Sequence, residues 1–411
     1  MKQHRVYITG IGAVTPIGIG REGLWKGALA GTRGVRSLQR FDSSPFRSKV
    51  AGQVDDFDPA DFLDKRVAQR SERFAQFSLA AARLAFEDAS YTPSGDDGDF
   101  GVWVGSALGG AAYGETQLRN FLDRGIKGVH PMLALSVFPA AACCNIAIHF
   151  GIHGPTVSNS NSCAAGAVAL GDAFHAVRSG LARRALAGGV EIPLTPLIFG
   201  AFDVIKSMSQ RNDDPSSASR PFDAQRDGFV MAEAACLMLL EREEDVVARG
   251  AQPYAEICGY ALTNDGSHMA APREDGREAK RAMVLAMHDA EVETTDVDHV
   301  NAHGSSTPLN DPTESRAIRD VFGAAADRVI VSGIKGMMGH ALGATGSVEA
   351  ALCALGIRDS VVVPTVNLET PAEGCDLRYS PAVPTPLKQK VVLSNSFGFG
   401  GLNAALVFKA A

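Results

Sequence analysis

Short apolar runs alternate with alanine-rich segments along the whole chain, and this alternation limits the folds open to it. The apolar runs have the length and composition of buried strands, and we predict strands at 6–10, 100–107, 183–191, 236–241, 254–262, 299–303, 329–333, 391–396 and 405–408. Helical patterns lie between them, at 73–89, 163–180 and 276–290. Strands that alternate with helices predict an α/β fold with buried sheets.

With 411 residues, the chain is long enough for two domains or for one large duplicated domain. The charged segment 241–253 is the best candidate for a join, which gives halves at 1–250 and 251–411. Each half ends in a strand, a glycine-rich turn and another apolar strand, so a weak duplication is plausible. The polar segment 211–228 lacks apolar periodicity and predicts an ordered surface loop.

Charge and composition exclude several classes of partner. The net charge is −7 and there is no long basic run, so we expect no nucleic acid partner. The chain contains no stretch of about 18 apolar residues, so we expect no membrane span. The apolar run near residue 10 is too short for a signal peptide. The cysteines number seven and follow no framework spacing, which favours a reducing cytoplasm.

Cys163 stands out among these cysteines. In SNSNSCAAGAVALGDA, residues 158–173, it lies between a polar strand end and a run of strong helix formers. A thiol at a helix N-terminus is favoured as thiolate, so we expect its pKa to lie below the free value of about 8.5. The small neighbours Ala164, Ala165 and Gly166 leave room for a reactant. The alternative is a small buried apolar side chain.

Three further segments combine polar side chains with glycine. NAHGSSTPLND, 301–311, places His303 at a strand end in a segment that cannot pack as core. VSGIKGMMGHALGATGSVEA, 331–350, places Lys335 and His340 in a glycine-rich loop before a helix that carries Glu349, and it does not match a phosphate loop. In SNSFGFGGLNAALVF, 394–408, Phe397 and Phe399 predict either a bulged hairpin or a mobile aromatic gate.

Two patterns resemble a cofactor site and a metal site but are incomplete. TGIGAVTPIG, 9–18, lacks the third glycine of a dinucleotide fingerprint and the acidic residue that should follow it. His149 and His153 have helical spacing, but Gly151 interrupts the helix and no third ligand is evident. Adjacent Cys143 and Cys144 are most simply core. We therefore expect no cofactor and no metal.

Together these segments resemble the elongating β-ketoacyl-acyl carrier protein synthases, the condensing enzymes of fatty-acid and polyketide assembly. The resemblance spans the chain, through VYITGIGAVTPIG, SRPFDAQRDGFVMAEAA and NSFGFGGLNAALVF. It implies a thiolase-like fold, in which two similar α/β halves stack in five layers, αβαβα. It also implies a dimer that acts on acyl carrier protein in the cytoplasm.

The resemblance also implies roles for the residues singled out above. Cys163 would accept the acyl group, while His303 and His340 would stabilise the enolate formed when malonyl-carrier protein loses CO2. Lys335, with Glu349, would order the histidine loop. Phe399 would be the gate, and its N–H would form an oxyanion hole with that of Cys163.

Other family positions map onto binding roles. Ser305 and Thr307 would bind the pantetheine arm, and Leu108 and Phe202 would line the acyl tunnel. The positive charges expected to dock the acidic carrier are Lys65, Arg66, Arg70, Lys127, Lys206 and Arg211.

The chain departs from the family pattern at the polar pair Asn161-Ser162, at EAAC (233–236), at Ala270 and at Leu402. Because of these departures, the pathway stays open between fatty-acid elongation and a specialised polyketide or polyene pathway, in which the chain is a homodimer or pairs with a chain-length-factor-like subunit. A thiolase is the rival within the same fold, but thiolases carry a second reactive cysteine where this chain has NSFGFGG. A non-catalytic chain-length subunit would lack the nucleophile, so the presence of Cys163 argues against it. A structural protein without enzymatic activity is disfavoured because it would leave the motifs unexplained.

Overall fold

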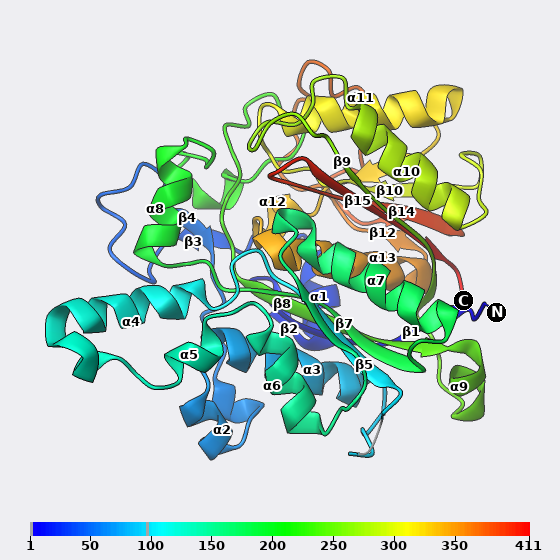
Figure 1. Ribbon diagram of the computed structural model, residues 1–411. Helices are drawn as coiled ribbons and strands as arrows, with labels where there is room; N and C mark the ends of the chain where they lie inside the picture. Colours follow the sequence, from blue (N-terminus) through cyan, green and yellow to red (C-terminus); the bar gives the residue numbers. More distant parts are fainter. Residues whose placement is uncertain (1–2, 96–97) are drawn as a thin grey trace.

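A single twisted sheet organises the computed structural model, which describes residues 3–95 and 98–411. Its strands follow the order β11-β10-β14-β15-β9-β1-β8-β7-β5-β6, with β2 beside β1. The strands are β1 (Val6–Thr15), β2 (Gly18–Ile19), β5 (Phe100–Gly105), β6 (Thr156–Asn159), β7 (Arg184–Glu191), β8 (Ala234–Arg242), β9 (Ala255–Asn264), β10 (His299–Asn301), β11 (Ile330–Ser332), β14 (Val391–Gly398) and β15 (Leu402–Lys409). Because β1 and β9 pair only over Val6–Ile8, the sheet folds into two layers (Figure 1).

The two halves of this sheet have the same topology. In the first half, β1 lies antiparallel to β8 and β8 antiparallel to β7, and parallel pairs then lead to β5 and β6. In the second half, β9, β15, β14, β10 and β11 repeat the order and the directions. The predicted pair of similar α/β halves is therefore confirmed. Helix α9 (Glu243–Ala248) follows β8, and the boundary between 250 and 251 stays a prediction.

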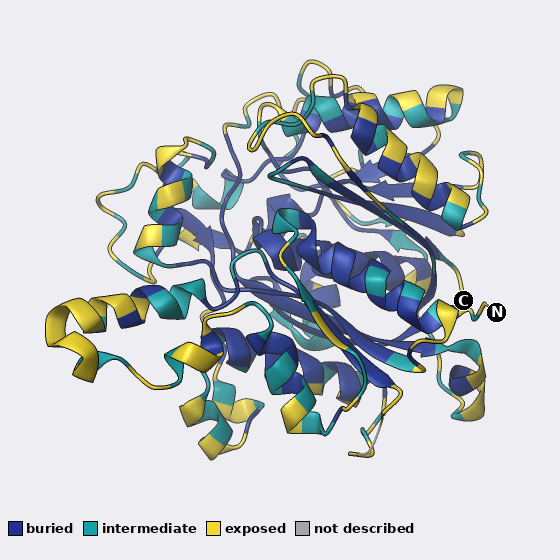
Figure 2. Ribbon diagram, viewed as in Figure 1, coloured by how far each residue is buried: buried dark blue, intermediate teal, exposed yellow. Residues whose placement is uncertain are grey.

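Helices complete the five layers around the two halves of the sheet (Figure 1). Those that build the layers are α3 (Arg73–Asp88) and α6 (Ala141–Phe150) on one outer face, α1 (Gly20–Leu29), α7 (Ala165–Ser179) and α13 (Thr345–Asp359) in the centre, and α10 (Arg277–Asp289) and α11 (Asn310–Phe322) on the other outer face. In Figure 2, α7 and α13 are buried along most of their length, whereas α10 and α11 present an exposed face.

Small residues allow the central helices to approach closely. A Cβ added to Gly166 would lie 2.7 Å from the carbonyl oxygen of Gly343, and one added to Gly346 would lie 3.0 Å from the Cβ of Ala167. Side chains larger than hydrogen would force these segments apart, because packed interiors have no spare volume. This contact brings the start of α7, which follows Cys163, against the start of α13, which follows His340.

The glycines near residue 10 have a packing role rather than a cofactor role. They lie inside β1, which passes under α3. A Cβ at Gly10 or Gly12 would lie 2.2 Å or 1.9 Å from the carbonyl oxygens of Ala85 and Ala81. Glycine in a strand often marks such a close approach of another backbone. The glycines of TGIGAVTPIG therefore allow β1 to contact α3 closely.

Smaller elements surround this framework. They are α2 (Lys65–Arg70), α4 (Ala111–Arg124), α5 (Leu133–Ser136), α8 (Pro196–Val204) and α12 (Lys335–Met338), with the strand pairs β3 (Val35–Ser37) with β4 (Val50–Gly52) and β12 (Val361–Val362) with β13 (Thr385–Pro386). In the part of the chain that the structure describes, no helix combines the length and apolarity needed to cross a membrane.

All nine predicted strands and all three predicted helices form, and the ends differ by a few residues. The segment 211–228 was expected at the surface, and this is wrong for its centre, 218–223, which is buried. The reason is that Phe222 packs into the core of the second half while its N–H donates to Asp311. Arg220 is buried with it and pairs with Asp223 at 2.9 Å.

Candidate active site

Cys163 lies on a single 3-10 turn, Ser162–Ala164, between β6 and α7. The preceding residue, Ser162, has φ of 48°, a left-handed conformation that side chains rarely adopt. Such backbone outliers concentrate at functional sites, where the surrounding structure enforces them. The thiol therefore precedes α7 by one turn, and it projects from a backbone held in an unusual shape.

The pKa of the Cys163 thiol is opposite in direction to the expectation. Burial raises the pKa to about 12, although backbone N–H groups of Phe399 and of Cys163 itself, together with the charge of Lys335, act to lower it. The prediction of a lowered pKa was wrong, because loss of hydration outweighs the field at a helix end when a thiol lies in apolar surroundings. The two N–H groups therefore lie near the sulfur.

His303 follows β10 and is fixed from both sides. The Glu314 carboxylate accepts the N–H of His303 at 2.7 Å and that of Gly304 at 2.8 Å. On the ring, Nδ1 accepts the N–H of Phe397 at 3.2 Å. An accepting nitrogen carries no proton, so the proton of the neutral ring is on Nε2.

His340 faces His303 across the same site. The two ring centroids are 5.3 Å apart and the planes are nearly perpendicular, at 84°. The backbone of His340 donates to Val230 at 2.7 Å, and its Nδ1 lies 2.9 Å from the hydroxyl of Thr345. Burial and the charge of Lys335 hold the pKa of both imidazoles well below 6.5. Both rings are therefore neutral near pH 7, and each has one N–H to donate.

Lys335 is fully buried behind the histidines. Its Nζ donates to the carbonyl of His303 and to Glu349 Oε1, the latter at 2.6 Å. Burial raises the pKa of Glu349 to about 7, while Lys335 acts to lower it. Lys335 begins the short helix α12, so the expected glycine-rich loop is partly helical. Lys335 thus fixes the backbone of His303 and supplies positive charge near both rings, while Glu349 holds Lys335 in place.

Replacing Lys335 with alanine should lower stability strongly. The substitution leaves Glu349 buried without its cation, and breaking a buried pair by removing one partner typically costs about 3–5 kcal/mol. Urea unfolding followed by circular dichroism measures this loss. The double variant Lys335→Met with Glu349→Leu should recover part of it, because no lone charge remains. Equal stability of Lys335→Ala and the parent chain would contradict this account of the pair.

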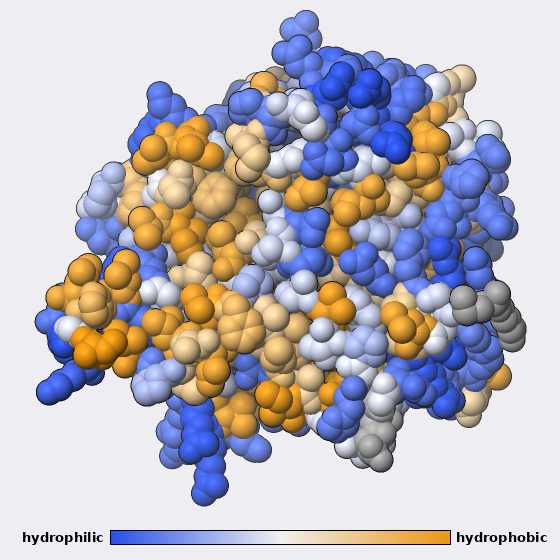
Figure 3. Space-filling model, viewed as in Figure 1, coloured by the Kyte–Doolittle hydropathy of each residue, from blue (hydrophilic) through white to orange (hydrophobic). Residues whose placement is uncertain are grey.

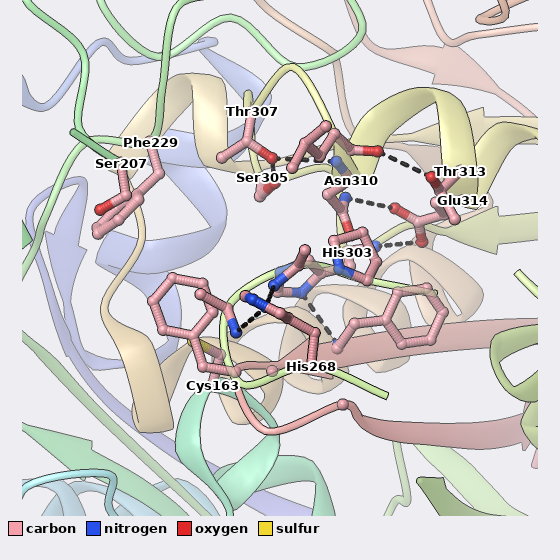
Figure 4. A pocket seen from close by; sticks show the side chains of 18 of the residues that line it. Cys163, Ser207, Phe229, His268, His303, Ser305, Thr307, Asn310, Thr313 and Glu314 are labelled. Atoms are coloured by element: carbon pink, nitrogen blue, oxygen red, sulfur yellow. Dashed lines mark hydrogen bonds between the residues drawn. The ribbon is translucent and has the colours of Figure 1, made fainter. Parts of the chain in front are cut away.

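A cavity of about 480 Å³ unites these groups (Figure 4). Predicted residues on its wall are Cys163, His303, His340, Phe399, Ser305, Thr307, Phe202 and Lys206. The hydroxyls of Ser305 and Thr307 are 2.8 Å apart. The rings of Phe399 and Phe202 stack at a centroid distance of 6.1 Å. The cavity thus brings together the predicted thiol, the two predicted imidazoles, the two predicted hydroxyls and an aromatic wall.

Two predicted residues lie close to the cavity without lining it. Leu108 was expected in the tunnel wall but is not among the described residues that line this cavity; it packs in the apolar cluster beside Cys163. Glu349 lies behind Lys335, in the interior.

The predicted docking residues are spread over several elements. Lys206 is exposed and lines the cavity. Lys65, Arg66 and Arg70 are exposed on α2, and Lys127 is exposed in the 3-10 turn Gly125–Gly128. Arg211 is half-buried and donates to the carbonyl of Gln225 at 3.3 Å.

Several residues of the site were not predicted. Glu314, Thr345 and His268 hold or line the cavity, and His268 Nδ1 accepts the N–H groups of Ala270 and Ala271 at 3.0 Å. Figure 4 places His268 and Cys163 at the same side of the cavity. The sequence gives only a weak signal for Glu314. Its position on α11 does not reveal that it accepts hydrogen bonds from His303 and Gly304, in a loop about ten residues earlier.

Two family models match most of the chain. The model described as Beta-ketoacyl synthase, N-terminal domain, matches residues 3–246, and the model described as Beta-ketoacyl synthase, C-terminal domain, matches residues 254–369. The chain belongs to the β-ketoacyl synthase family. Membership confirms the resemblance seen in the sequence, and it argues against the thiolase alternative.

Individual β-ketoacyl synthases match over their full lengths. The chain is 42% identical to "3-oxoacyl-[acyl-carrier-protein] synthase 2" of Synechocystis sp. over 410 residues, which covers 100% of this chain and 99% of the relative. A solved type II PKS ketosynthase in complex with its acyl-carrier protein is 34% identical, with a TM-score of 0.93 and full coverage of both chains. "The ishigamide ketosynthase/chain length factor" is 31% identical, also with a TM-score of 0.93 and full coverage.

Proposed function

We propose that the protein catalyses decarboxylative condensation of an acyl group held on Cys163 with malonyl-carrier protein, to give 3-oxoacyl-carrier protein. The observation that carries this proposal is the convergence of Cys163, His303 and His340 on one cavity. The relatives named 3-oxoacyl-[acyl-carrier-protein] synthase support it. The pathway is fatty-acid or type II polyketide chain elongation.

The first step is acyl transfer. The sulfur of Cys163 attacks the thioester carbonyl of the acyl-carrier protein, and the new C–S bond replaces the bond to the pantetheine sulfur. The N–H groups of Phe399 and Cys163, which lie near the sulfur, stabilise the oxyanion. The proton of Cys163 leaves with the pantetheine thiol. Since burial raises the pKa of the free thiol, Cys163 keeps its proton until the attack, and that proton passes to the pantetheine sulfur.

The second step uses the two neutral imidazoles. When malonyl-carrier protein loses CO2, the thioester oxygen becomes an enolate oxygen, and the N–H groups of His303 and His340 donate to it. The enolate carbon then attacks the acyl thioester, and a C–C bond replaces the bond to Cys163. The departing sulfur takes up one proton. Neutral donors suit this role because their charge does not change during the reaction.

The proposal is tested by product analysis. The protein is incubated with acyl-carrier protein and malonyl-carrier protein labelled with ¹³C at the methylene carbon, and the carrier is analysed by mass spectrometry. A 3-oxoacyl product that retains the labelled methylene carbon supports the proposal. Label recovered only as acetyl-carrier protein, with no new C–C bond even after a candidate second subunit is added, would overturn it.

We also propose that the protein acts as a dimer, either with a second copy or with a chain-length-factor-like subunit. Strand β6 ends the strand order, and Val157 on it is 41% exposed. Apolar side chains gather nearby on α4, α5 and α6, and Ile148 is 83% exposed. Figure 3 shows apolar surface where α4 and α5 lie in Figure 1. The ketosynthase/chain length factor structure supports such an assembly.

All seven cysteines are free thiols, which supports a cytoplasmic location.

Reversing the charge of Lys206 should weaken carrier binding. Lys206 is exposed where it lines the cavity, and carrier proteins in this family are acidic. A charge at the rim of an interface acts mainly on association and on salt dependence. We expect Lys206→Glu to raise KM for acyl-carrier protein by about tenfold at low salt, with kcat nearly unchanged. Lys26→Glu, an exposed lysine on α1, is the control. Equal KM values for the two variants would contradict the docking role.

A further inference from the structure

Glu191 is a buried carboxylate that neither the catalytic steps nor the sequence patterns explain. It ends β7 and is 0% exposed. Four groups donate hydrogen bonds to it: the hydroxyl of Ser106 and the N–H groups of Ala107, Leu108 and Gly343. Burying a carboxylate is costly, so a buried one is expected to have a specific structural or chemical use.

The four hydrogen bonds join two loops from different halves of the molecule. Oε1 accepts from Ser106 at 2.9 Å and from Leu108 at 3.1 Å, both in the loop after β5. Oε2 accepts from Ala107 at 2.7 Å and from Gly343 at 2.9 Å, so one oxygen bridges the loop after β5 and the turn after His340. A Cβ at Gly343 would lie 2.6 Å from this oxygen. Only glycine permits the approach.

Both loops lie next to the proposed reacting groups, Cys163 and His340. Leu108 and Leu342 belong to one apolar cluster with Cys163 and Phe202. Leu342 also lines the cavity, and its φ of 39° places it in the left-handed region. The turn that carries this strained residue begins at His340 and ends at the Gly343 N–H held by Glu191. The carboxylate therefore ties the apolar wall beside the nucleophile to the turn that presents a histidine.

We propose that Glu191 is a positioning residue that couples Leu108, in the apolar cluster beside Cys163, to the placement of His340. The inference rests on the proposed condensation, and it adds a residue to which no role had been given. An acyl chain that displaces Leu108 displaces the Glu191 carboxylate, and through Gly343 it displaces the histidine turn. The fit of the acyl chain would thereby influence how well the malonyl unit is decarboxylated.

Glu191→Gln tests this coupling. The amide has nearly the same shape, but its NH2 group cannot accept from an N–H, so at least one loop is released. We expect decarboxylation of malonyl-carrier protein to fall about tenfold, in line with the loss of a positioned donor. We also expect the ratio of kcat/KM for a long to a short acyl chain to rise about fivefold, because Leu108 is free to move. Glu191→Asp keeps the charge but is too short to span both loops, and it should behave in the same way.

The matched control is Glu241→Gln. Glu241, on β8, is also 0% exposed, but it pairs with Arg184 and Arg249, away from the cavity. It should lose stability with no change in the acyl-chain ratio. If Glu191 had a purely structural role, Glu191→Gln would also lose stability and leave the acyl-chain ratio unchanged. An unchanged acyl-chain ratio together with an unchanged rate of decarboxylation would therefore overturn the proposal. If the parent chain itself forms neither adduct nor product, the proposed function fails instead.

Discussion

Replacing Cys163 with alanine should abolish acyl transfer and lower condensation by at least about three orders of magnitude. The cavity holds no other thiol among its described lining residues, so no group remains to form the acyl-enzyme. The oxyanion donors and the two imidazoles stay in place, and such a site keeps only the rate that binding and polarisation supply. Product formation is measured by mass spectrometry of the carrier protein.

Two further variants make this result specific. Cys163→Ser keeps the size of the side chain, but a hydroxyl is a weaker nucleophile, so acylation should be slow but detectable. Cys258→Ala removes a half-buried thiol on β9, outside the cavity, and should react as the parent does. Unchanged condensation in folded Cys163→Ala would show that the acyl group is not carried on this residue.

Replacing His303 or His340 with alanine should separate the two steps. Each imidazole contributes one N–H to the enolate, and removal of one such donor typically lowers the rate by about 10²–10³, or roughly 3–4 kcal/mol of barrier. Acyl transfer to Cys163 uses backbone donors, so the acyl adduct should still form. We therefore expect a stable adduct that does not react with malonyl-carrier protein. Adduct formation and CO2 release are measured on the same sample.

Conservative variants sharpen the assignment of these donors. Asparagine retains an N–H, so His303→Asn should be more active than His303→Ala if donation is what matters. His175→Ala is the control, since His175 on α7 lies outside the cavity and its Nε2 is 3.4 Å from Asp289. Loss of the adduct together with the product in both alanine variants would place the histidines in acyl transfer, against this account.

The sequence predicted the fold in two ways. Strand lengths and alanine-rich helices predicted an α/β fold, and every predicted strand formed, whereas the two stacked halves were implied by the resemblance to the condensing enzymes. The packing role of Gly10 and Gly12 was not predicted, because their contact with α3 depends on two elements meeting in space. No pattern within one strand contains that information.

The site was predicted less completely. The pKa of Cys163 was predicted in the wrong direction, because the argument considered the helix end but not the desolvation imposed by distant apolar residues. Glu314 and Glu191 were missed since their partners are backbone N–H groups of remote loops, which leave no spacing pattern. Residue types identify reactive groups, whereas tertiary contacts determine how they are held.

The most direct test of the account is to locate the acyl group. The protein is incubated with acyl-carrier protein, digested, and analysed by peptide mass spectrometry, so that each of the seven cysteines is examined separately. The account predicts one acyl group, on the peptide that contains Cys163, which disappears when malonyl-carrier protein is added. An acyl group on another cysteine, or one on Cys163 that malonyl-carrier protein never removes, would contradict it.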